Sequence, residues 1–206
     1  MKLLQLGVLV SGRGTNLQSI INAIENGQLD ARVALVISDK ANAPALERCR
    51  KHKVSYLFLE PEDFADKNAF ESTLIDRLRA RSVDLVCLAG YMRILGKRFI
   101  ERFRGKIINI HPSLLPAFPG LDAQKQALDY GVKVTGCTVH FVDEGIDSGA
   151  IIAQSSLPVQ GKDNEVSLSE RILEQEHILY PKVIQWIAEN RVSLTGRKVT
   201  LDLEQK

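Results

Sequence analysis

Apolar residues recur along the first half of the chain in short, nearly continuous runs, separated by stretches in which they are three or four positions apart. The runs cover residues 3–10, 32–37, 54–58 and 84–89. Each has the length and composition of a strand buried on both faces. Apolar spacing between the runs predicts helices that begin near residue 15 and that cover 43–51 and 64–81. Strands alternating with helices predict an α/β fold with a doubly wound, Rossmann-like parallel sheet.

The second half of the chain has a different pattern. Residues 132–142 alternate between apolar and polar, and residues 149–158 return as a second strand, which together predict an antiparallel hairpin. Apolar residues at helical spacing over 165–190 predict one long closing helix. We find no repeats and no sign of a second domain, so we expect residues 1–206 to form a single domain.

Composition and charge exclude several classes of partner. The chain of 206 residues has 27 Lys and Arg against 25 Asp and Glu, a net charge of +2, which predicts neither a nucleic-acid nor a membrane surface. The N-terminal residues show no signal-peptide pattern, and no apolar run approaches the ~20 residues that span a bilayer. The 3 Cys form no C-x-x-C pair, so we expect no metal. We expect a cytoplasmic protein, monomeric or weakly dimeric, that acts on small molecules.

The stretch 106–116, K-I-I-N-I-H-P-S-L-L-P, carries the first candidate chemistry. Its β-branched residues predict a buried strand that ends before Pro112. Asn109 and His111 are two positions apart and therefore share one face at the carboxyl end of this strand, where α/β folds bind ligands. An amide that can hold an oxyanion beside a general acid/base is equipment for acyl transfer. A turn in which His111 caps the strand end explains the same residues equally well.

A glycine loop follows the first strand. Residues 11–16 read S-G-R-G-T-N and lead directly into a helix, a junction at which backbone N–H groups and the helix dipole bind anions. There is no G-K-[ST], and Leu17 occupies the third glycine position of a dinucleotide fingerprint, so a single phosphate is the favoured anion. Alternatively, Gly12 and Gly14 only permit a tight turn, and Thr15 or Asn16 caps the helix.

Two further loops are ambiguous from the residues alone. Residues 90–95, G-Y-M-R-I-L, place apolar side chains after a strand, where they either fill the core or bind a flat ligand, and the core is favoured. Residues 143–149, D-E-G-I-D-S-G, concentrate carboxylates and glycines, which is typical of a solvated hairpin turn.

The motif N-I-H-P-S-L-L-P, together with S-G-R-G-T-N-L-Q near the N-terminus, resembles the folate-dependent formyltransferases, from the first strand to about Trp186. The pairing is most similar to the branch of the family that acts on glycinamide ribonucleotide. This resemblance implies transfer of the formyl group of 10-formyltetrahydrofolate, a cosubstrate, to the amine of that ribonucleotide in de novo purine (IMP) biosynthesis, without a metal. A 10-formyltetrahydrofolate hydrolase, or another formyltransferase built on the same module, is the alternative.

The resemblance also implies roles for individual residues. Asn109, His111 and Asp147 match the catalytic positions. The positions that hold the ribonucleotide match Gly14, Thr15, Asn16 and Glu176, although Glu176 alone reads as an exposed helix carboxylate. The positions that hold the folate match Lys67, Met92, Arg93, Ile94, Leu95 and Asn109.

Two residues and one loop have no settled role. Lys67 stands where some relatives carry Arg, and Lys cannot make the same bidentate contact with a carboxylate. His140 is either a histidine at the edge of the core or a neighbour of the site. The loop 117–122, which contains Asp122, is assigned no chemistry.

Overall fold

The computed structural model describes residues 3–202. The chain divides into two compact units, and the boundary falls between Ile108 and Asn109, within a single strand. Each unit is described by itself below. The expected single domain over residues 1–206 stays a prediction.

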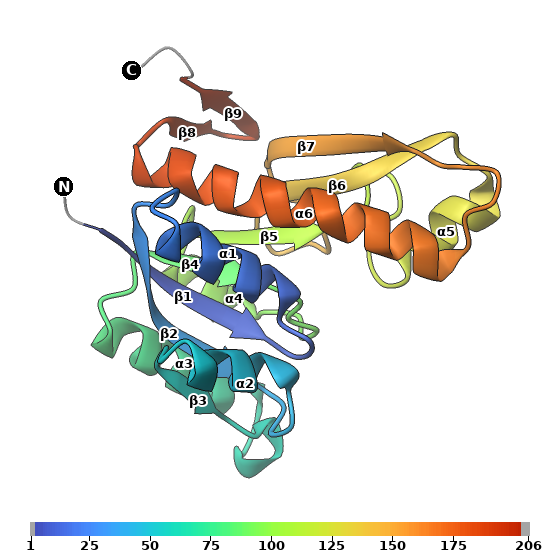
Figure 1. Ribbon diagram of the computed structural model, residues 1–206. Coiled ribbons are helices and arrows are strands. Elements are labelled where there is room, and N and C mark those ends of the chain that lie inside the picture. The colour runs from blue at the N-terminus through green and yellow to red at the C-terminus, as the bar shows by residue number, and fades with distance from the viewer. Residues whose placement is uncertain (1–2, 203–206) are drawn as a thin grey trace. The chain divides into compact units, whose positions relative to one another are not determined.

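The first unit contains the parallel part of the sheet (Figure 1). Strands β1 (Leu4–Val10), β2 (Ala31–Ser38), β3 (Tyr56–Phe58) and β4 (Leu85–Leu88) are arranged in the order β3-β2-β1-β4, and each pairs with its neighbour in parallel. Strand β5 (Ile107–His111) begins beside β4. The helices of this unit are α1 (Thr15–Glu25), α2 (Pro44–Lys51), the short 3-10 helix η1 (Pro61–Asp63), α3 (Lys67–Ala80) and α4 (Lys97–Arg102).

In this unit two elements begin two or more residues later than the sequence predicts, and one short helix was not expected. The third strand is shorter than 54–58, and the following helix begins at Lys67 instead of residue 64. The Asp66 carboxylate accepts a hydrogen bond from the Ala69 N–H at 2.8 Å and so caps the helix there. Helix α4 was not predicted, because a helix of 6 residues is too short to show an apolar period.

The second unit contains the end of β5 and the antiparallel hairpin of β6 (Val134–Phe141) and β7 (Ile151–Pro158). Helix α5 (Ala123–Tyr130) precedes the hairpin, and α6 (Glu165–Ala188) packs on both of its strands (Figure 1). A small sheet of β8 (Val192–Thr195) and β9 (Lys198–Leu201) follows. The predicted fold class is therefore confirmed: an α/β fold with a mostly parallel sheet, an antiparallel C-terminal hairpin and a long closing helix.

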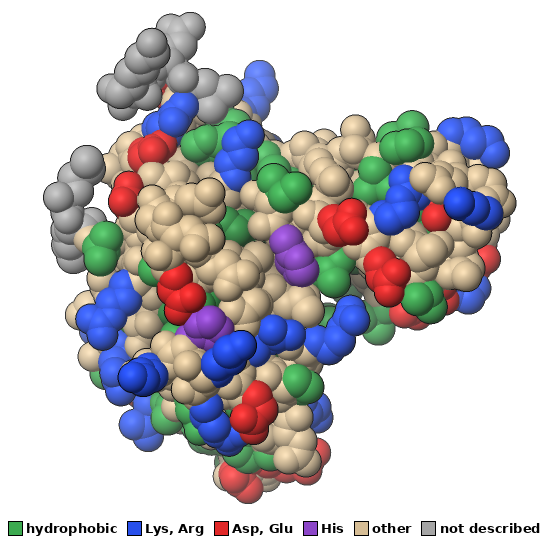
Figure 2. All heavy atoms as spheres, viewed as in Figure 1, with side chains coloured by type: hydrophobic (Ala, Val, Ile, Leu, Met, Phe, Trp, Pro, Cys, Tyr) green, Lys and Arg blue, Asp and Glu red, His purple; other side chains and the backbone are tan. Residues whose placement is uncertain are grey.

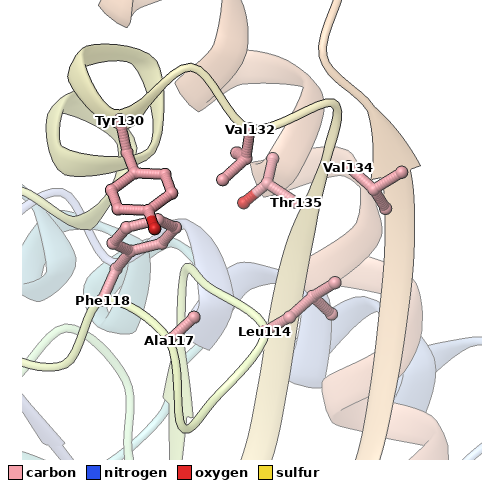
Figure 3. A pocket seen from close by; sticks show the side chains of 7 residues that line it. All are labelled: Leu114, Ala117, Phe118, Tyr130, Val132, Val134 and Thr135. Atoms are coloured by element: carbon pink, nitrogen blue, oxygen red, sulfur yellow. The ribbon is translucent and has the colours of Figure 1, made fainter.

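The surface carries charges of both signs. Figure 2 shows Lys and Arg side chains interspersed with Asp and Glu over the face in view. Within residues 3–202, none of the helices combines the length and apolarity needed to cross a bilayer.

Candidate active site

Strand β5 places two polar side chains at its carboxyl end. Ile107, Ile108 and Ile110 are buried and hold the strand in the core. The alternation of the strand then puts Asn109 and His111 on one face. Asn109 is half-buried and His111 is 5% exposed, so this end of the strand is shielded from water.

The Asp147 carboxylate lies against both of these side chains. Its Oδ1 is 3.4 Å from the amide Nδ2 of Asn109, and its Oδ2 is 3.3 Å from Nδ1 of His111. The neighbouring carboxylates of the same turn do not share this position: Asp143 accepts hydrogen bonds from the Gly145 N–H and the Ser148 hydroxyl, and Glu144 is exposed. The structure therefore brings Asn109, His111 and Asp147 together.

His140 is a fourth member of this cluster. Its Nδ1 lies 2.8 Å from the Phe141 carbonyl oxygen, which can only accept, so Nδ1 carries a hydrogen. Its Nε2 lies 3.3 Å from Nδ2 of Asn109 and 3.6 Å from Oδ1 of Asp147. The sequence left His140 open between the edge of the core and the site. It is buried, at 1% exposure, and it contacts both site residues.

The loop 117–122 contributes to the cluster through its backbone. The Phe118 carbonyl oxygen lies 2.8 Å from Nε2 of His111, and the Gly120 N–H donates to Oδ2 of Asp147 at 2.8 Å. Phe118 adopts a left-handed backbone conformation, with φ of 54°. We assigned this loop no chemistry from its side chains. Sequence reasoning missed the two contacts because every residue has these backbone groups.

The surroundings shift the pKa values of both titratable partners. Burial lowers the pKa of His111; the hydrogen bond to the Phe118 carbonyl and the charge of Asp147 act in the opposite direction, and His140 adds to the lowering. Burial acts to raise the pKa of Asp147, but contacts with His140, the Gly120 N–H and His111 outweigh it, and the pKa falls below its usual value. At neutral pH the site therefore holds a charged carboxylate beside an imidazole that burial keeps neutral.

This arrangement has the chemical equipment for acyl transfer. The Asn109 amide and the Nε2–H of His111 are hydrogen-bond donors that can stabilise a developing oxyanion. The Asn109 contacts, at 3.3 and 3.4 Å, are longer than the usual 2.9–3.0 Å. The amide can therefore exchange them for a stronger hydrogen bond to a charged acceptor. Asp147 supplies a base within reach of the same face.

The glycine loop 11–16 turns sharply onto the start of α1. Gly14 has a φ of 68°, and a Cβ at this position would lie 2.6 Å from Cβ of Ala45, so the loop packs directly on α2. The Ala45 N–H also donates to the Gly12 carbonyl at 3.1 Å. Gly14 is itself the N-cap residue, and no side chain in the described chain caps this helix there. The alternative in which Thr15 or Asn16 is the capping residue is therefore wrong, and the phosphate role of these residues stays a prediction.

The residues matched to folate binding in the first unit line one cavity of about 370 Å³. Met92 and Ile94 are 67% and 63% exposed, so they do not fill the core, whereas Leu95 is buried. The Arg93 guanidinium lies 5.6 Å from the centre of the Phe70 ring, a cation–π distance. The complete lining is Lys67, Phe70, Glu71, Tyr91, Met92, Arg93, Ile94 and Leu95.

Glu176 lies on α6 and is buried, at 6% exposure, which contradicts its reading as an exposed helix carboxylate. Burial raises the pKa of the Cys137 thiol to about 12, and the charge of Glu176 adds to this shift. Over residues 3–202, no group of three or more His, Cys, Asp or Glu side chains is placed to hold a metal ion.

Comparison with known proteins supplies independent information. The Formyl transferase family model matches residues 4–184. The chain is 44% identical to the phosphoribosylglycinamide formyltransferase of Bacillus subtilis, over 88% of this chain and 93% of that protein. It is 46% identical over 95% of its length to the trifunctional purine biosynthetic protein adenosine-3 of Drosophila melanogaster, but it spans only 15% of that protein.

Solved structures agree with these relatives. The crystal structure of glycinamide ribonucleotide transformylase 1 from Symbiobacterium toebii is 50% identical with a TM-score of 0.95, covering 97% of this chain and 94% of that chain. A formyltetrahydrofolate deformylase from Pseudomonas syringae has the same fold, with a TM-score of 0.89, but it is 26% identical and this chain covers 66% of it.

Proposed function

The chain belongs to the formyl transferase family, and from this premise we propose that it is a phosphoribosylglycinamide formyltransferase. It transfers the formyl group of 10-formyltetrahydrofolate to the amine of glycinamide ribonucleotide, giving formylglycinamide ribonucleotide and tetrahydrofolate in de novo purine biosynthesis. The observation that carries this proposal is the cluster of Asn109, His111 and Asp147 at the end of β5. A protein that only bound a nucleotide would need the glycine loop but not this cluster.

The reaction requires stabilisation of negative charge. When the amine attacks the formyl carbon, the carbonyl oxygen becomes an oxyanion, and donors aimed at that oxygen lower the barrier. Asn109 supplies an amide N–H. His111 supplies its Nε2–H, which at present donates to the Phe118 carbonyl at 2.8 Å and must exchange that oxygen for the oxyanion. Because Nε2 carries its hydrogen in the neutral imidazole, His111 can act as a donor without being protonated further.

The reaction also moves a proton from the attacking amine to N10 of the donor. Asp147 is kept ionised by its hydrogen bonds, and its charge supports an imidazolium at His111 if Nδ1 gains a proton. We therefore assign proton transfer to Asp147, with His111 as its partner.

Binding roles follow from the chemistry of the two substrates. Gly14, Thr15 and Asn16, at the start of α1, suit the single phosphate of the ribonucleotide, because N–H groups at a helix N-terminus attract anions. Glu176 suits the amine end of that substrate.

The folate residues suit a flat ring that carries a charged tail. Met92 and Ile94 offer exposed apolar surface to a pterin, whereas Arg93 and Lys67 offer positive charge on the same cavity. We also assign Asn109 to binding of the formyl donor, because its amide N–H has to contact the formyl oxygen. The cytoplasm, where both substrates are soluble, is the proposed location, and the enzyme is proposed to be a monomer or weak homodimer without a nucleic-acid or membrane partner.

One assay tests the proposal against its alternative. The purified protein is incubated with 10-formyltetrahydrofolate, with and without glycinamide ribonucleotide, and both tetrahydrofolate and formate are measured. We expect tetrahydrofolate to form only when the ribonucleotide is present, with no release of formate. Formate release that does not depend on the ribonucleotide would instead identify a hydrolase.

A further inference from the structure

The loop 91–95 is held at both ends by side chains from other elements of the first unit. At its start, the Ser11 hydroxyl accepts the Met92 N–H at 3.0 Å. Immediately after its end, the Glu71 carboxylate accepts the Gly96 N–H at 2.7 Å through Oε1. Side chains from outside the loop therefore hold both ends of this part of the cavity lining in place.

Glu71 occupies an unusual position for a carboxylate. It is 2% exposed and belongs to the buried face of α3 with Phe70, Leu74, Ile75 and Leu78. Burial of a charge is costly unless the charge is paired and hydrogen-bonded. The ammonium of Lys67 is 3.8 Å from Oε1, and Oε2 has no hydrogen-bond partner within residues 3–202. Helix stability alone would favour an apolar residue here, so the carboxylate must serve another purpose.

Gly96 is shaped to receive this carboxylate. A Cβ at position 96 would lie 2.6 Å from Oε2 of Glu71 and 3.2 Å from Oε1, so the absence of a side chain lets the carboxylate reach the backbone. Gly96 is also the N-cap residue of α4, directly before its first residue Lys97. The pair therefore fixes the point where the 91–95 loop passes into that helix.

We propose that Glu71 is a positioning residue for the formyl donor: together with Ser11 it pre-orders the 91–95 loop that receives the pterin end of the folate. This inference rests on the proposed function. Ordering a loop residue costs backbone conformational entropy. If the loop is already ordered in the free enzyme, donor binding does not have to supply that free energy. Glu71 thus acts on donor affinity through the loop, without having to contact the donor.

The test compares two substitutions at this position. Glu71→Gln keeps an oxygen that can accept the Gly96 N–H but removes the charge. Glu71→Leu removes the acceptor and places an apolar side chain on the apolar face of α3, so the variant should fold. We expect Glu71→Leu to raise the KM for 10-formyltetrahydrofolate roughly ten- to a hundredfold, the usual effect of losing a hydrogen bond to a charged group. Its KM for the ribonucleotide should stay within about twofold, and Glu71→Gln should recover most of the donor affinity.

Glu101 provides a matched control. It pairs with Lys97 in the same i,i+4 arrangement, at 3.9 Å, but its side chain is 49% exposed. Glu101→Leu and Glu101→Gln should leave both KM values unchanged, because an exposed pair of this kind contributes little.

A second measurement separates this inference from the proposed function. Hydrogen–deuterium exchange of the backbone amides of residues 90–96, in the protein without ligands, should be at least tenfold faster in Glu71→Leu than in wild type, with an unchanged melting temperature. A wild-type protein that does not formylate the ribonucleotide would overturn the proposed function. The exchange experiment would still show whether Glu71 orders the 91–95 loop. If Glu71→Leu has the same amide exchange rates and the same KM for the formyl donor as wild type, the inference is overturned.

Discussion

Nε2 of His111 lies 2.8 Å from the carbonyl oxygen of Phe118, and this contact determines the tautomer of the imidazole. A carbonyl oxygen can only accept, so Nε2 carries a hydrogen and Nδ1 faces the Asp147 carboxylate at 3.3 Å. A second proton on the ring would sit on Nδ1, where Asp147 favours it and burial opposes it. Asp147 is therefore the neighbouring charge that favours a protonated His111, against the larger opposing effect of burial.

The first prediction follows from this interaction. Asp147→Asn keeps the size of the side chain but removes its charge, so the pKa of His111 should fall further below its ordinary value. Turnover should drop by on the order of 10²–10⁴, the usual contribution of a positioned acid/base group. The KM values should stay near wild type, because the lost interaction belongs to the transition state. Steady-state kinetics and NMR titration of the imidazole measure these effects.

Glu144→Gln is the control for this prediction. Glu144 lies in the same turn, three positions before Asp147, but its side chain is exposed. Neutralising it should leave turnover within about twofold of wild type, since surface charges contribute little. Equal losses in the two variants, or an unmoved His111 pKa in Asp147→Asn, would show that the catalytic carboxylate has been misassigned.

The second prediction concerns the glycine loop. Asn16 is 8% exposed in the first turn of α1, where we place the phosphate of the ribonucleotide. Asn16→Asp would put a negative charge beside that phosphate, so the KM for glycinamide ribonucleotide should rise by tenfold or more, on the order of 1.4 kcal/mol or more of repulsion. The KM for the folate should change little, as measured in parallel titrations of the two substrates.

Asn26→Asp, at the other end of the same helix, makes the identical change of charge on an exposed residue. It should leave both KM values near those of wild type. A rise in both KM values on Asn16→Asp would argue against a phosphate role, because it would indicate general disruption instead of a local repulsion.

The sequence predicts those parts of the site that depend on local periodicity. The alternation of β5 is enough to place Asn109 and His111 on one face, and the apolar run before Gly12 places the glycine loop at a strand end. These inferences need only the geometry of one strand and its neighbouring turn. The same reasoning predicts the order of the longer strands and helices, including the hairpin and the closing helix, but not the short helix α4.

The remaining features depend on contacts between residues distant in sequence. Asp143, Glu144 and Asp147 are equivalent as turn residues, and only the folded hairpin shows that Asp147 reaches His111. The Phe118 carbonyl contacts His111 through the backbone, so the residue type at position 118 does not reveal this contact. Glu71 was overlooked because the apolar spacing of α3 describes the face on which it lies without revealing that a carboxylate is buried there.

The third prediction concerns the 91–95 loop. Ile94 is 63% exposed and lines the cavity we assign to the folate. Ile94→Asp should weaken binding of a non-reactive folate analogue by roughly 10–100-fold, because it replaces apolar contact surface with a hydrated charge. The melting temperature should change little. Lys67→Ala should have a smaller effect, since an exposed Lys–carboxylate pair contributes only ~0–1 kcal/mol.

Ile178→Asp is the matched control, because Ile178 is 65% exposed on α6 and lines neither cavity nor cluster described above. Calorimetric titration of both variants should show a loss of affinity only for Ile94→Asp. Unchanged affinity in that variant would assign the loop to ordinary surface.

The last prediction uses the lowered pKa of His111 to set the direction of a pH effect on stability. Because the folded state disfavours the imidazolium, the unfolded chain binds more protons at this residue as the pH falls below its ordinary pKa of 6.5. Stability should therefore decline as the pH decreases through that value, by at most about 1.4 kcal/mol per pH unit for one proton. In His111→Gln this contribution is absent. Urea unfolding at pH 7.5 and 5.5 should show that wild type loses more free energy of unfolding between the two conditions than His111→Gln does. The opposite ordering, with wild type gaining stability relative to the variant at pH 5.5, would mean that Asp147 outweighs burial and that His111 is already an imidazolium in the free enzyme.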